Sequence, residues 1–279
     1  LLFSVNKKKN QVNKIRHKSF WLTFFQNFFL LFPAKLALRV FKKKNQVNKI
    51  RHKSFCPAFF KKLEKGVKME NKRNYQRELD DILKRIEKNE KKPVLLLHSC
   101  CGPCSSYVLE YLTQYFYIKL FFYNPNIQPS EEYSKRLLEQ KKIIDRMKLA
   151  DCVELIEGEY NPADFFSEVK GLESEPEGGK RCEVCIKMRM AEAAKAAKLY
   201  NAEYFATTLT VSPHKNAPFI NKTGNELSEE YGIAYLVSDF KKKNGYKRSI
   251  ELCREYDIYR QNYCGCVFSC QNRTDTDNI

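Results

Sequence analysis

Short apolar runs alternate along the chain with longer stretches in which apolar residues recur every three or four positions. A compact apolar run predicts a buried strand, and the three-to-four-residue period predicts an amphipathic helix. The predicted strands are Val94–Leu97, Tyr117–Tyr123, Cys152–Ile156, Ala202–Thr207 and Ala234–Val237. The predicted helices are Asn74–Lys91, Ser105–Tyr115, Ser130–Met147 with Ser130 as its cap, Asn161–Lys170, Arg181–Tyr200, Phe219–Tyr231 and Arg248–Gln261.

Strands that alternate with helices at this spacing predict βαβ units and a mostly parallel sheet. The expected fold is therefore an α/β three-layer sandwich of the Rossmann-like kind. The loops that follow the strands of such a sheet converge at its carboxyl edge, where ligands bind. One functional site is expected at this edge, built from the loops Cys100–Cys104, Asn124–Pro129, Thr208–Lys215 and Ser238–Tyr246.

The first 68 residues differ in character from the rest of the chain. Lys7–Phe20 and Lys42–Phe55 are identical 14-residue segments, and they flank the aromatic-rich stretch Trp21–Phe41. Polar residues and a proline interrupt that stretch, so a membrane-spanning helix is not expected. Because nothing in the segment can bury a core, we expect it to lie outside the functional protein, with Met69 as the natural start.

The formal net charge of +17 comes from this first segment. Residues 1–68 hold 18 of the 50 Lys and Arg residues and one of the 33 acidic residues, which leaves 32 basic and 32 acidic residues after them. The expected single catalytic domain (residues 69–272), followed by a tail (273–279), thus belongs to a neutral region. A nucleic-acid partner must be argued from local patches and not from the charge of the chain.

Eleven cysteines fall mainly into three groups, around Cys100, Cys182 and Cys264. Clusters of cysteines in an α/β chain favour metal-binding or catalytic thiols over the disulfides of secreted proteins. We therefore expect a protein of a reducing compartment, the cytoplasm. The first group follows the first strand, and the amino end of the next helix favours thiolates there.

Cys182-Glu183-Val184-Cys185 places two sulfur atoms on one face at the start of a helix. With Cys100 and either Cys101 or Cys104, this pair would form a four-thiolate site for Zn²⁺ or an iron–sulfur cluster at the carboxyl edge of the strands. A second interpretation is a thioredoxin-like redox pair, since Cys101 and Cys104 are two residues apart at a strand-to-helix turn. A third is that these cysteines are small buried hydrophobic residues.

The third cysteine group contains Cys264-Gly265-Cys266. The small disulfide ring that this pair can close is strained and easily reduced. The spacing therefore favours a dithiol that cycles between two redox states. A metal half-site is the alternative.

Three further polar side chains fall near the same predicted edge. His98, on the first strand, is a candidate metal ligand or proton donor, and a hydrogen-bonded core histidine is an equal alternative. Asp239 ends the fifth strand, where a carboxylate could ligate iron or position a substrate hydroxyl. His214 lies beside Lys215 in a loop that could meet a phosphate or a nucleoside.

Basic residues surround Tyr246 after the fifth strand. Cations with an aromatic ring among them suit an RNA backbone with a base stacked on the ring. A solvated run of charges is the alternative. The basic residues of this patch are Lys241, Lys242, Lys243, Lys247 and Arg248.

Several short motifs follow one another between residues 72 and 270, and their order and spacing are informative. They are His98-x-Cys100-Cys101-Gly102-Pro103-Cys104, Tyr123-Asn124-Pro125-Asn126-Ile127, Arg181-Cys182-x-x-Cys185, Thr207-Thr208-Leu209 with Ser212-Pro213, Asp239-Phe240-Lys241, and Tyr259-Arg260-Gln261-x-Tyr263-Cys264-Gly265-Cys266. Together they resemble the QueH family of epoxyqueuosine reductases. The chain departs from the family at Gly102, where alanine is frequent, and residues 1–68 have no counterpart.

The resemblance implies that epoxyqueuosine at the wobble position of tRNA is reduced to queuosine by two-electron removal of its epoxide oxygen. It implies a [4Fe-4S] cluster on Cys100, Cys101, Cys182 and Cys185, and a redox-active pair formed by Cys264 and Cys266. A second, mononuclear iron is a further expectation, with Cys104 and the catalytic Asp239 as candidate ligands. The expected partners are the tRNA and an external electron donor, with no membrane.

Substrate or tRNA binding is expected from residues at the predicted edge. They are His98, Tyr123, Asn124, Asn126, Ser212, Lys215, Lys241, Lys243, Tyr246 and Arg248. Two other functions stay open. One is a zinc-containing RNA-binding protein without redox chemistry, and the other is a thiol–disulfide oxidoreductase that uses Cys101 and Cys104.

Overall fold

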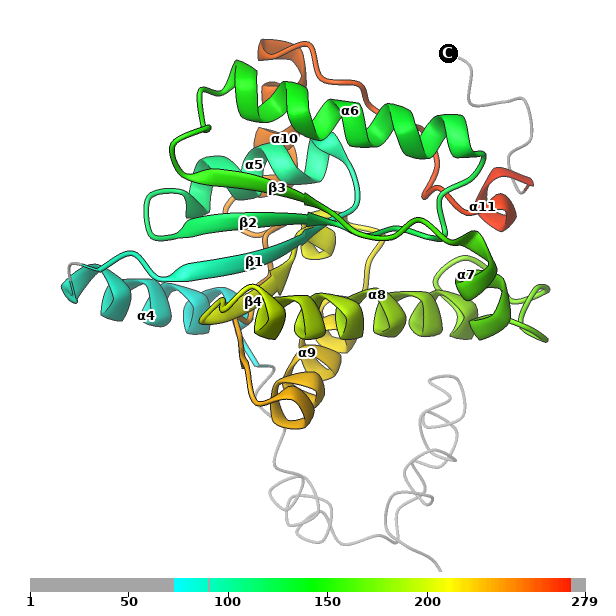
Figure 1. Cartoon of the computed structure of the whole chain (residues 1–279), viewed down its shortest axis with the longest axis horizontal. Helices are drawn as coiled ribbons and strands as arrows, with labels where there is room; N and C mark the ends of the chain where they lie inside the picture. Colours follow the sequence, from blue (N-terminus) through cyan, green and yellow to red (C-terminus); the bar gives the residue numbers. More distant parts are fainter. Residues whose placement is uncertain (1–72, 90, 272–279) are drawn as a thin grey trace, which may run out of the picture. The chain divides into compact units, whose positions relative to one another are not determined.

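The structure is a computed structural model that describes residues 73–89 and 91–271 (Figure 1). The predictions for residues 1–68 and for the tail at 273–279 lie outside the described residues. Within the described part, one parallel sheet is covered by helices on both faces.

The sheet has five strands, all parallel, in the order β3-β2-β1-β4-β5. The central strand β1 pairs with β2 and β4, so that Leu97 faces Leu120 on one side and Ala206 on the other. The chain runs outward from β1 through β2 to β3 and then returns to β4. The order therefore reverses between β1 and β4, the point at which α/β sheets bind ligands. The strands are β1 (Val94–Ser99), β2 (Tyr117–Phe122), β3 (Val153–Glu157), β4 (Tyr204–Thr207) and β5 (Ala234–Tyr235).

Helices cover both faces of the sheet, and Figure 1 shows α5, α6 and α10 on one face and α8 and α9 on the other. The predicted three-layer α/β sandwich is thereby confirmed. No helix among the described residues has the length and apolar character needed to cross a membrane. The helices are α4 (Tyr75–Lys88), α5 (Gly102–Leu112), α6 (Ser130–Arg146), α7 (Pro162–Glu168), α8 (Lys180–Leu199), α9 (Ala217–Tyr231), α10 (Gly245–Glu255) and α11 (Val267–Gln271).

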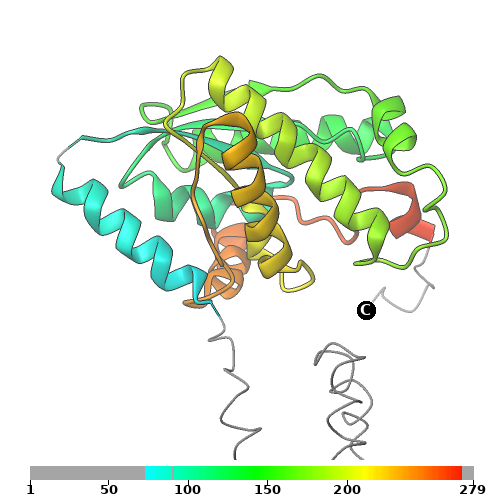
Figure 2. The same cartoon turned by 90° about the horizontal axis from the view of Figure 1, so that it is seen from below.

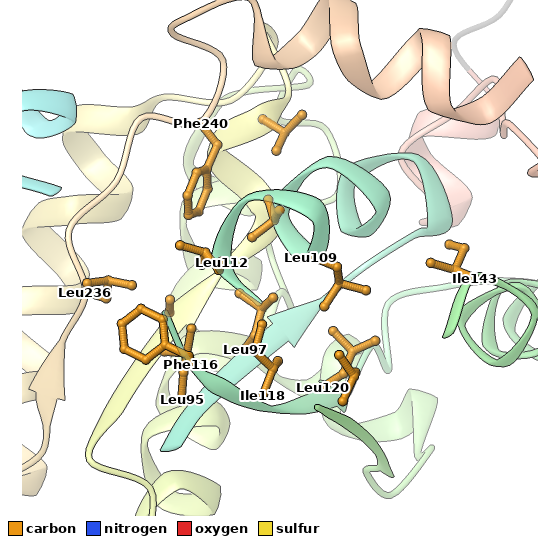
Figure 3. Close-up of a cluster of buried hydrophobic side chains, with 14 of the residues drawn as sticks. Leu95, Leu97, Leu109, Leu112, Phe116, Ile118, Leu120, Ile143, Leu236 and Phe240 are labelled. Atoms are coloured by element: carbon orange, nitrogen blue, oxygen red, sulfur yellow. The ribbon is translucent and has the colours of Figure 1, made fainter. Parts of the chain in front are cut away.

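The core lies on both sides of β1 because successive side chains of a strand point to opposite faces. Leu95 and Leu97 pack with Leu109 of α5 in one hydrophobic cluster (Figure 3), whereas Leu96 packs with α8 and α9 in another. A strand buried on both faces reads in sequence as a continuous apolar run, which is why the run at Val94–Leu97 could be recognised.

The predicted bounds of two helices near the sheet edge are wrong. α5 begins at Gly102 and not at Ser105, because a proline such as Pro103 is tolerated in the first turn of a helix. Cys104 therefore lies in that first turn and not in a loop. α10 begins at Gly245 and not at Arg248, so Tyr246 lies in this helix and not in a loop, and it ends at Glu255 and not at Gln261. Residues 256–266, which we call the C-terminal strap, therefore connect α10 to α11 (Figure 2).

Two smaller differences concern the cap of α6 and the segment after β4. Ser130 is the first residue of α6, with Pro129 at the cap position that had been predicted for Ser130. Thr208–Val211 forms a short 3₁₀ helix within a segment predicted as a loop. Gly102 packs so tightly that a Cβ atom there would lie 2.8 Å from Cγ2 of Ile258, at the start of the C-terminal strap.

We expect Leu97→Ala to lower the free energy of unfolding by about 2–5 kcal/mol, because it leaves a cavity where a fully buried side chain packs on both β2 and α5. Leu199→Ala is the matched control, since this leucine is 74% exposed, and it should change the value by about 0.5 kcal/mol or less. Urea unfolding under reducing, anaerobic conditions measures both. Equal losses in the two variants would contradict the central position of β1.

Candidate active site: a cavity lined by cysteines

Three cysteines meet where β1 ends and α5 begins, and we call them the cysteine triad. Cys100 and Cys101 follow β1, and Cys104 lies in the first turn of α5. Their Sγ atoms all lie within 4.8 Å of one another, close enough to hold a metal ion, and the Sγ atoms of Cys100 and Cys101 are 3.7 Å apart. A set of sulfur ligands suits zinc or iron.

The three thiols differ in their acidity. Hydrogen bonds from Cys101 and Cys104 hold the pKa of Cys100 well below its ordinary value. The same hydrogen bond to Cys100 raises the pKa of Cys101 to about 12, and the hydrogen bonds to Cys100 and Cys101 raise the pKa of Cys104. A metal ion that bound all three sulfur atoms would therefore displace protons from Cys101 and Cys104.

His98 is fully buried in β1, and both of its ring nitrogens have partners. Nδ1 lies 3.0 Å from Oγ1 of Thr207, and Nε2 lies 3.1 Å from the carbonyl oxygen of Tyr123. Burial, together with the nearby charge of Arg189, lowers the pKa of His98 to about 4, so the ring is neutral at pH 7. These contacts match the core-histidine interpretation and give no support to a substrate role.

A cavity of about 610 Å³, the large cavity, opens beside the cysteine triad. Its walls come from segments that are far apart in the sequence but meet at the carboxyl edge of the sheet, as the strand order requires. Besides the triad, they include Leu209, Ser212, His214 and Lys215 after β4, Tyr246 and Ser249 of α10, and residues 260–264 of the C-terminal strap.

A second, small cavity of about 10 Å³ brings the other two cysteine groups together. Cys182 and Cys185, at the start of α8, line it with Cys264 and Cys266 of the C-terminal strap. Burial raises the pKa of Cys185 to about 11. Cys264 lines both cavities, so the cysteine groups around Cys100 and Cys182 face the same strap residue from two sides.

Arg189 of α8 also lines both cavities, although it was not among the residues predicted from the sequence. It is buried, and its hydrogen bonds go to neutral oxygens: Nε donates to the carbonyl of Cys185 at 3.2 Å and Nη1 to Oδ1 of Asn124 at 3.3 Å. Burial works to lower the pKa of Arg189, but the neighbouring sulfur atoms of Cys185, Cys264 and Cys100 raise it overall. A signal was present, because Arg189 follows Cys185 by one helical turn.

Lys215 lines both cavities. Its Nζ donates a hydrogen bond to Sγ of Cys264 at 3.2 Å, and the side chain is 12% exposed. Burial works to lower the pKa of Lys215, but the attraction of Cys264 raises it above its ordinary value. Lys215 therefore keeps an ammonium group beside the strap cysteine at neutral pH.

The candidate residues that follow β2 are buried next to the two cavities, where they contact the end of β1 and Arg189. Asn124 is buried, and its Nδ2 donates to the carbonyl of Ser99 at 2.8 Å while its Oδ1 accepts from Arg189. Asn126 lines the small cavity, and its buried Oδ1 has no hydrogen-bond partner. Tyr123 is largely buried and stacks on Phe121.

The basic patch around Tyr246 is largely neutralised by acidic neighbours. Lys243 pairs with Asp80 at 2.7 Å, and Arg248 pairs with Glu110 at 2.6 Å. Lys241 lies 3.1 Å from Oδ1 of Asp239, an oxygen that is buried and accepts no hydrogen bond. These contacts favour a structural role for Lys243 and Arg248. Tyr246 is the member of the patch that reaches the large cavity.

Comparison with known proteins places the chain among close relatives. The family model described as epoxyqueuosine reductase QueH matches residues 95–272. A protein of that name from Streptococcus pyogenes serotype M1 is 46% identical over 198 residues, which cover 70% of this chain and 78% of the relative. One from Staphylococcus epidermidis is 47% identical over 208 residues, covering 73% of this chain and 87% of the relative. One from Thermotoga maritima is 37% identical over 187 residues, covering 65% of this chain and 92% of the relative.

Arg189→Met should weaken metal binding to the reduced, metal-free protein about 10- to 100-fold, because the thiolates lose the positive charge buried beside them. Titration with Cd²⁺, followed by its sulfur charge-transfer absorbance, measures the affinity. Arg254→Met on the exposed face of α10 is the control and should bind as the unaltered protein does. Equal affinity in both variants would mean that Arg189 does not stabilise the thiolates.

Proposed function

This chain belongs to the QueH family of epoxyqueuosine reductases, and on that premise we propose that it is an iron–sulfur oxidoreductase that reduces epoxyqueuosine in tRNA to queuosine. The observation that carries the proposal is the large cavity at the carboxyl edge of the sheet, which has the cysteine triad and Cys264 in its lining. A cavity with this lining can offer metal ligands and a redox-active thiol to one substrate.

The residues present fit a [4Fe-4S] cluster and a second iron by the chemistry of their donors. The cluster would be held by Cys100, Cys101, Cys182 and Cys185, which the family pattern assigns to it, and the charge of Arg189 would balance their thiolates. Cys104 is the candidate ligand for a second iron, since its sulfur lies in the same triad. Asp239 is the other candidate; its buried Oδ1 accepts no hydrogen bond and lies 3.1 Å from Nζ of Lys241, a partner that an iron would replace.

Removing an epoxide oxygen as water requires two electrons and two protons, and both C–O bonds of the ring must break. The cluster, when bound, would supply electrons one at a time. Cys264 and Cys266, as a disulfide, would accept two electrons and two protons from an external donor, and the resulting dithiol would pass them on and return to the disulfide. The ammonium group of Lys215, held beside Cys264, would stabilise negative charge on the departing oxygen.

The substrate base belongs to a single-stranded anticodon loop, so it can enter a cavity without the melting of a duplex. The lining of the large cavity has groups for such a base: the ring of Tyr246 for stacking, and the hydroxyl of Ser212. Gln261 adds a buried Oε1 that has no partner and could accept from an N–H group of the base. With Lys243 and Arg248 paired to acids, contact with the phosphate backbone would rest on other cations.

Purification of the full chain without oxygen should yield a brown protein with about four irons and four sulfides in a cluster, and one further iron where the second site is filled. This protein should convert epoxyqueuosine in tRNA to queuosine when given a strong chemical reductant, and Cys100→Ser should abolish both colour and conversion. Visible spectra, metal analysis and mass spectrometry of digested tRNA measure these results. A colourless protein with one zinc would refute the proposal and favour the zinc-containing RNA-binding alternative.

Cys104→Ser separates the roles within the triad. If Cys104 binds the second iron and not the cluster, the variant should keep the visible spectrum of the cluster and lose about one iron per chain. Cys182→Ser should instead lose the cluster spectrum. The opposite pattern, with the spectrum lost in the Cys104 variant and kept in the Cys182 variant, would move Cys104 into the cluster.

A further inference from the structure

The C-terminal strap has no regular secondary structure before α11, and much of its length is held by polar side chains of α6. At its start, Arg146 donates hydrogen bonds to the carbonyls of Tyr256 and Asp257. Further along, Oε2 of Glu139 accepts from the backbone N–H of Tyr259 at 3.0 Å. Polar side chains of α6 thus bind backbone groups of the strap at several points between α10 and Cys264.

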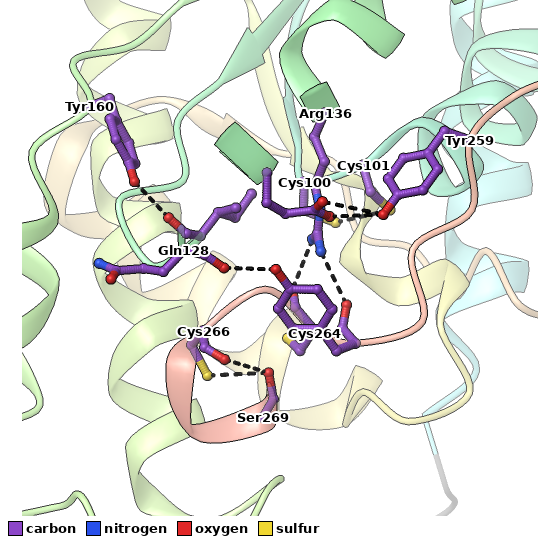
Figure 4. A network of polar contacts seen from close by, with 12 residues as sticks. Cys100, Cys101, Gln128, Arg136, Tyr160, Tyr259, Cys264, Cys266 and Ser269 are labelled. Carbon is purple, nitrogen blue, oxygen red and sulfur yellow. Dashed lines mark hydrogen bonds and ion pairs between the residues drawn. The ribbon is translucent and has the colours of Figure 1, made fainter. Parts of the chain in front are cut away.

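Arg136 holds the part of the strap that carries Cys264 (Figure 4). Its Nη1 donates to the carbonyl of Cys264 at 3.0 Å, and its Nη2 donates to the carbonyl of Tyr263 at 3.3 Å. Its Nε pairs with Oε1 of Glu132 at 2.7 Å. The guanidinium group also lies 5.1 Å from the centre of the Tyr263 ring, so it contacts two successive residues of the strap.

The loop before α6 holds the next residue from another direction. The backbone N–H of Gln128 donates to the carbonyl of Gly265 at 2.8 Å, and its carbonyl accepts from the hydroxyl of Tyr263 at 2.7 Å. Gly265 has a φ of +122°, and a Cβ atom there would lie 2.9 Å from Nη1 of Arg136. Three successive carbonyls, from Tyr263 to Gly265, are therefore fixed, and glycine is required where the backbone passes Arg136.

This fixed backbone decides where the sulfur atom of Cys264 lies. The side chain lines both cavities, and its Sγ accepts the hydrogen bond from Lys215. A buried ion pair costs desolvation energy that apolar packing would avoid, so its presence here points to a need for a defined position.

We propose that Arg136, oriented by Glu132, is the positioning residue that holds the Cys264 thiol between the cysteine triad and the cysteines of α8. This inference rests on the proposed function, because the reductase reaction is what requires a thiol at that place. Arg136 acts on the reaction only through the strap backbone. Loss of its contacts should displace Cys264 while the sheet and both cavities' other walls stay in place.

Arg136→Met tests the proposal, and Arg146→Met is its matched control, since both arginines lie on α6 and bind strap carbonyls but Arg146 contacts the end remote from Cys264. In the anaerobically purified full chain, Arg136→Met should lower kcat for tRNA about 10- to 100-fold with little change in KM. Arg136→Lys should recover part of the loss, because lysine can reach one carbonyl but not both. Arg146→Met should keep kcat.

A second readout follows the thiol directly and needs no substrate. Alkylation of reduced protein by iodoacetamide, read by peptide mass spectrometry, should be severalfold faster at Cys264 in Arg136→Met than in the unaltered chain, relative to the exposed Cys270 as internal reference. Visible spectra confirm that the metal content is unchanged. If Arg136→Met does not fold, Glu132→Gln takes its place, and it should show the same two changes to a smaller degree.

Equal alkylation of Cys264 and equal kcat in the Arg136 and Arg146 variants would overturn the proposal. So would losses of the same size in both variants, because they would show that α6 only stabilises the strap as a whole. A chain that fails to reduce epoxyqueuosine but shows the selective change in alkylation would refute the proposed function and leave the positioning role of Arg136 standing.

Discussion

A guanidinium group buried among sulfur atoms is the interaction on which the arrangement of this site depends. Arg189 gives its hydrogen bonds to neutral oxygens, and the neighbouring sulfur with a lowered pKa, that of Cys100, supplies negative charge to balance it. A buried charge without such balance is costly. Because Arg189 lies one turn after Cys185 on α8, this requirement ties α8 to the end of β1, where the triad begins. It also joins the two cavities, since Arg189 lines both.

The sheet could be predicted from the sequence because β1 and its neighbours are buried on both faces, which leaves unbroken apolar runs. The position of the cysteine triad at the carboxyl edge followed from the parallel order of those strands. The contacts of the charged residues could not be predicted in this way. Lys243 and Asp80 are 163 positions apart, and Arg248 and Glu110 are 138 positions apart, so a patch that suggested RNA binding is paired by residues that no local pattern connects to it.

The role of α6 was missed for a different reason. The charged residues of α6 are surrounded in sequence by lysines and glutamates, which amphipathic helices usually expose to solvent. The sequence pattern therefore does not distinguish the buried Arg136 from its neighbour Lys135. The need for them arises in the strap, whose backbone groups lack the partners that a helix or sheet supplies. Charged side chains on a long rigid helix satisfy those groups, and the strap thereby takes a defined course without secondary structure of its own.

The close approach of Gly102 and Ile258 has a consequence for how related sequences can diverge. A methyl group at position 102 would lie 2.8 Å from the side chain of Ile258, so a chain with alanine there needs a smaller or differently branched residue at position 258, or a shifted strap. Residues 102 and 258 should therefore change together in evolution, although 155 residues lie between them in the sequence. Sequence variation in the first turn of α5, which carries Cys104, is thereby coupled to sequence variation in the strap, which carries Cys264.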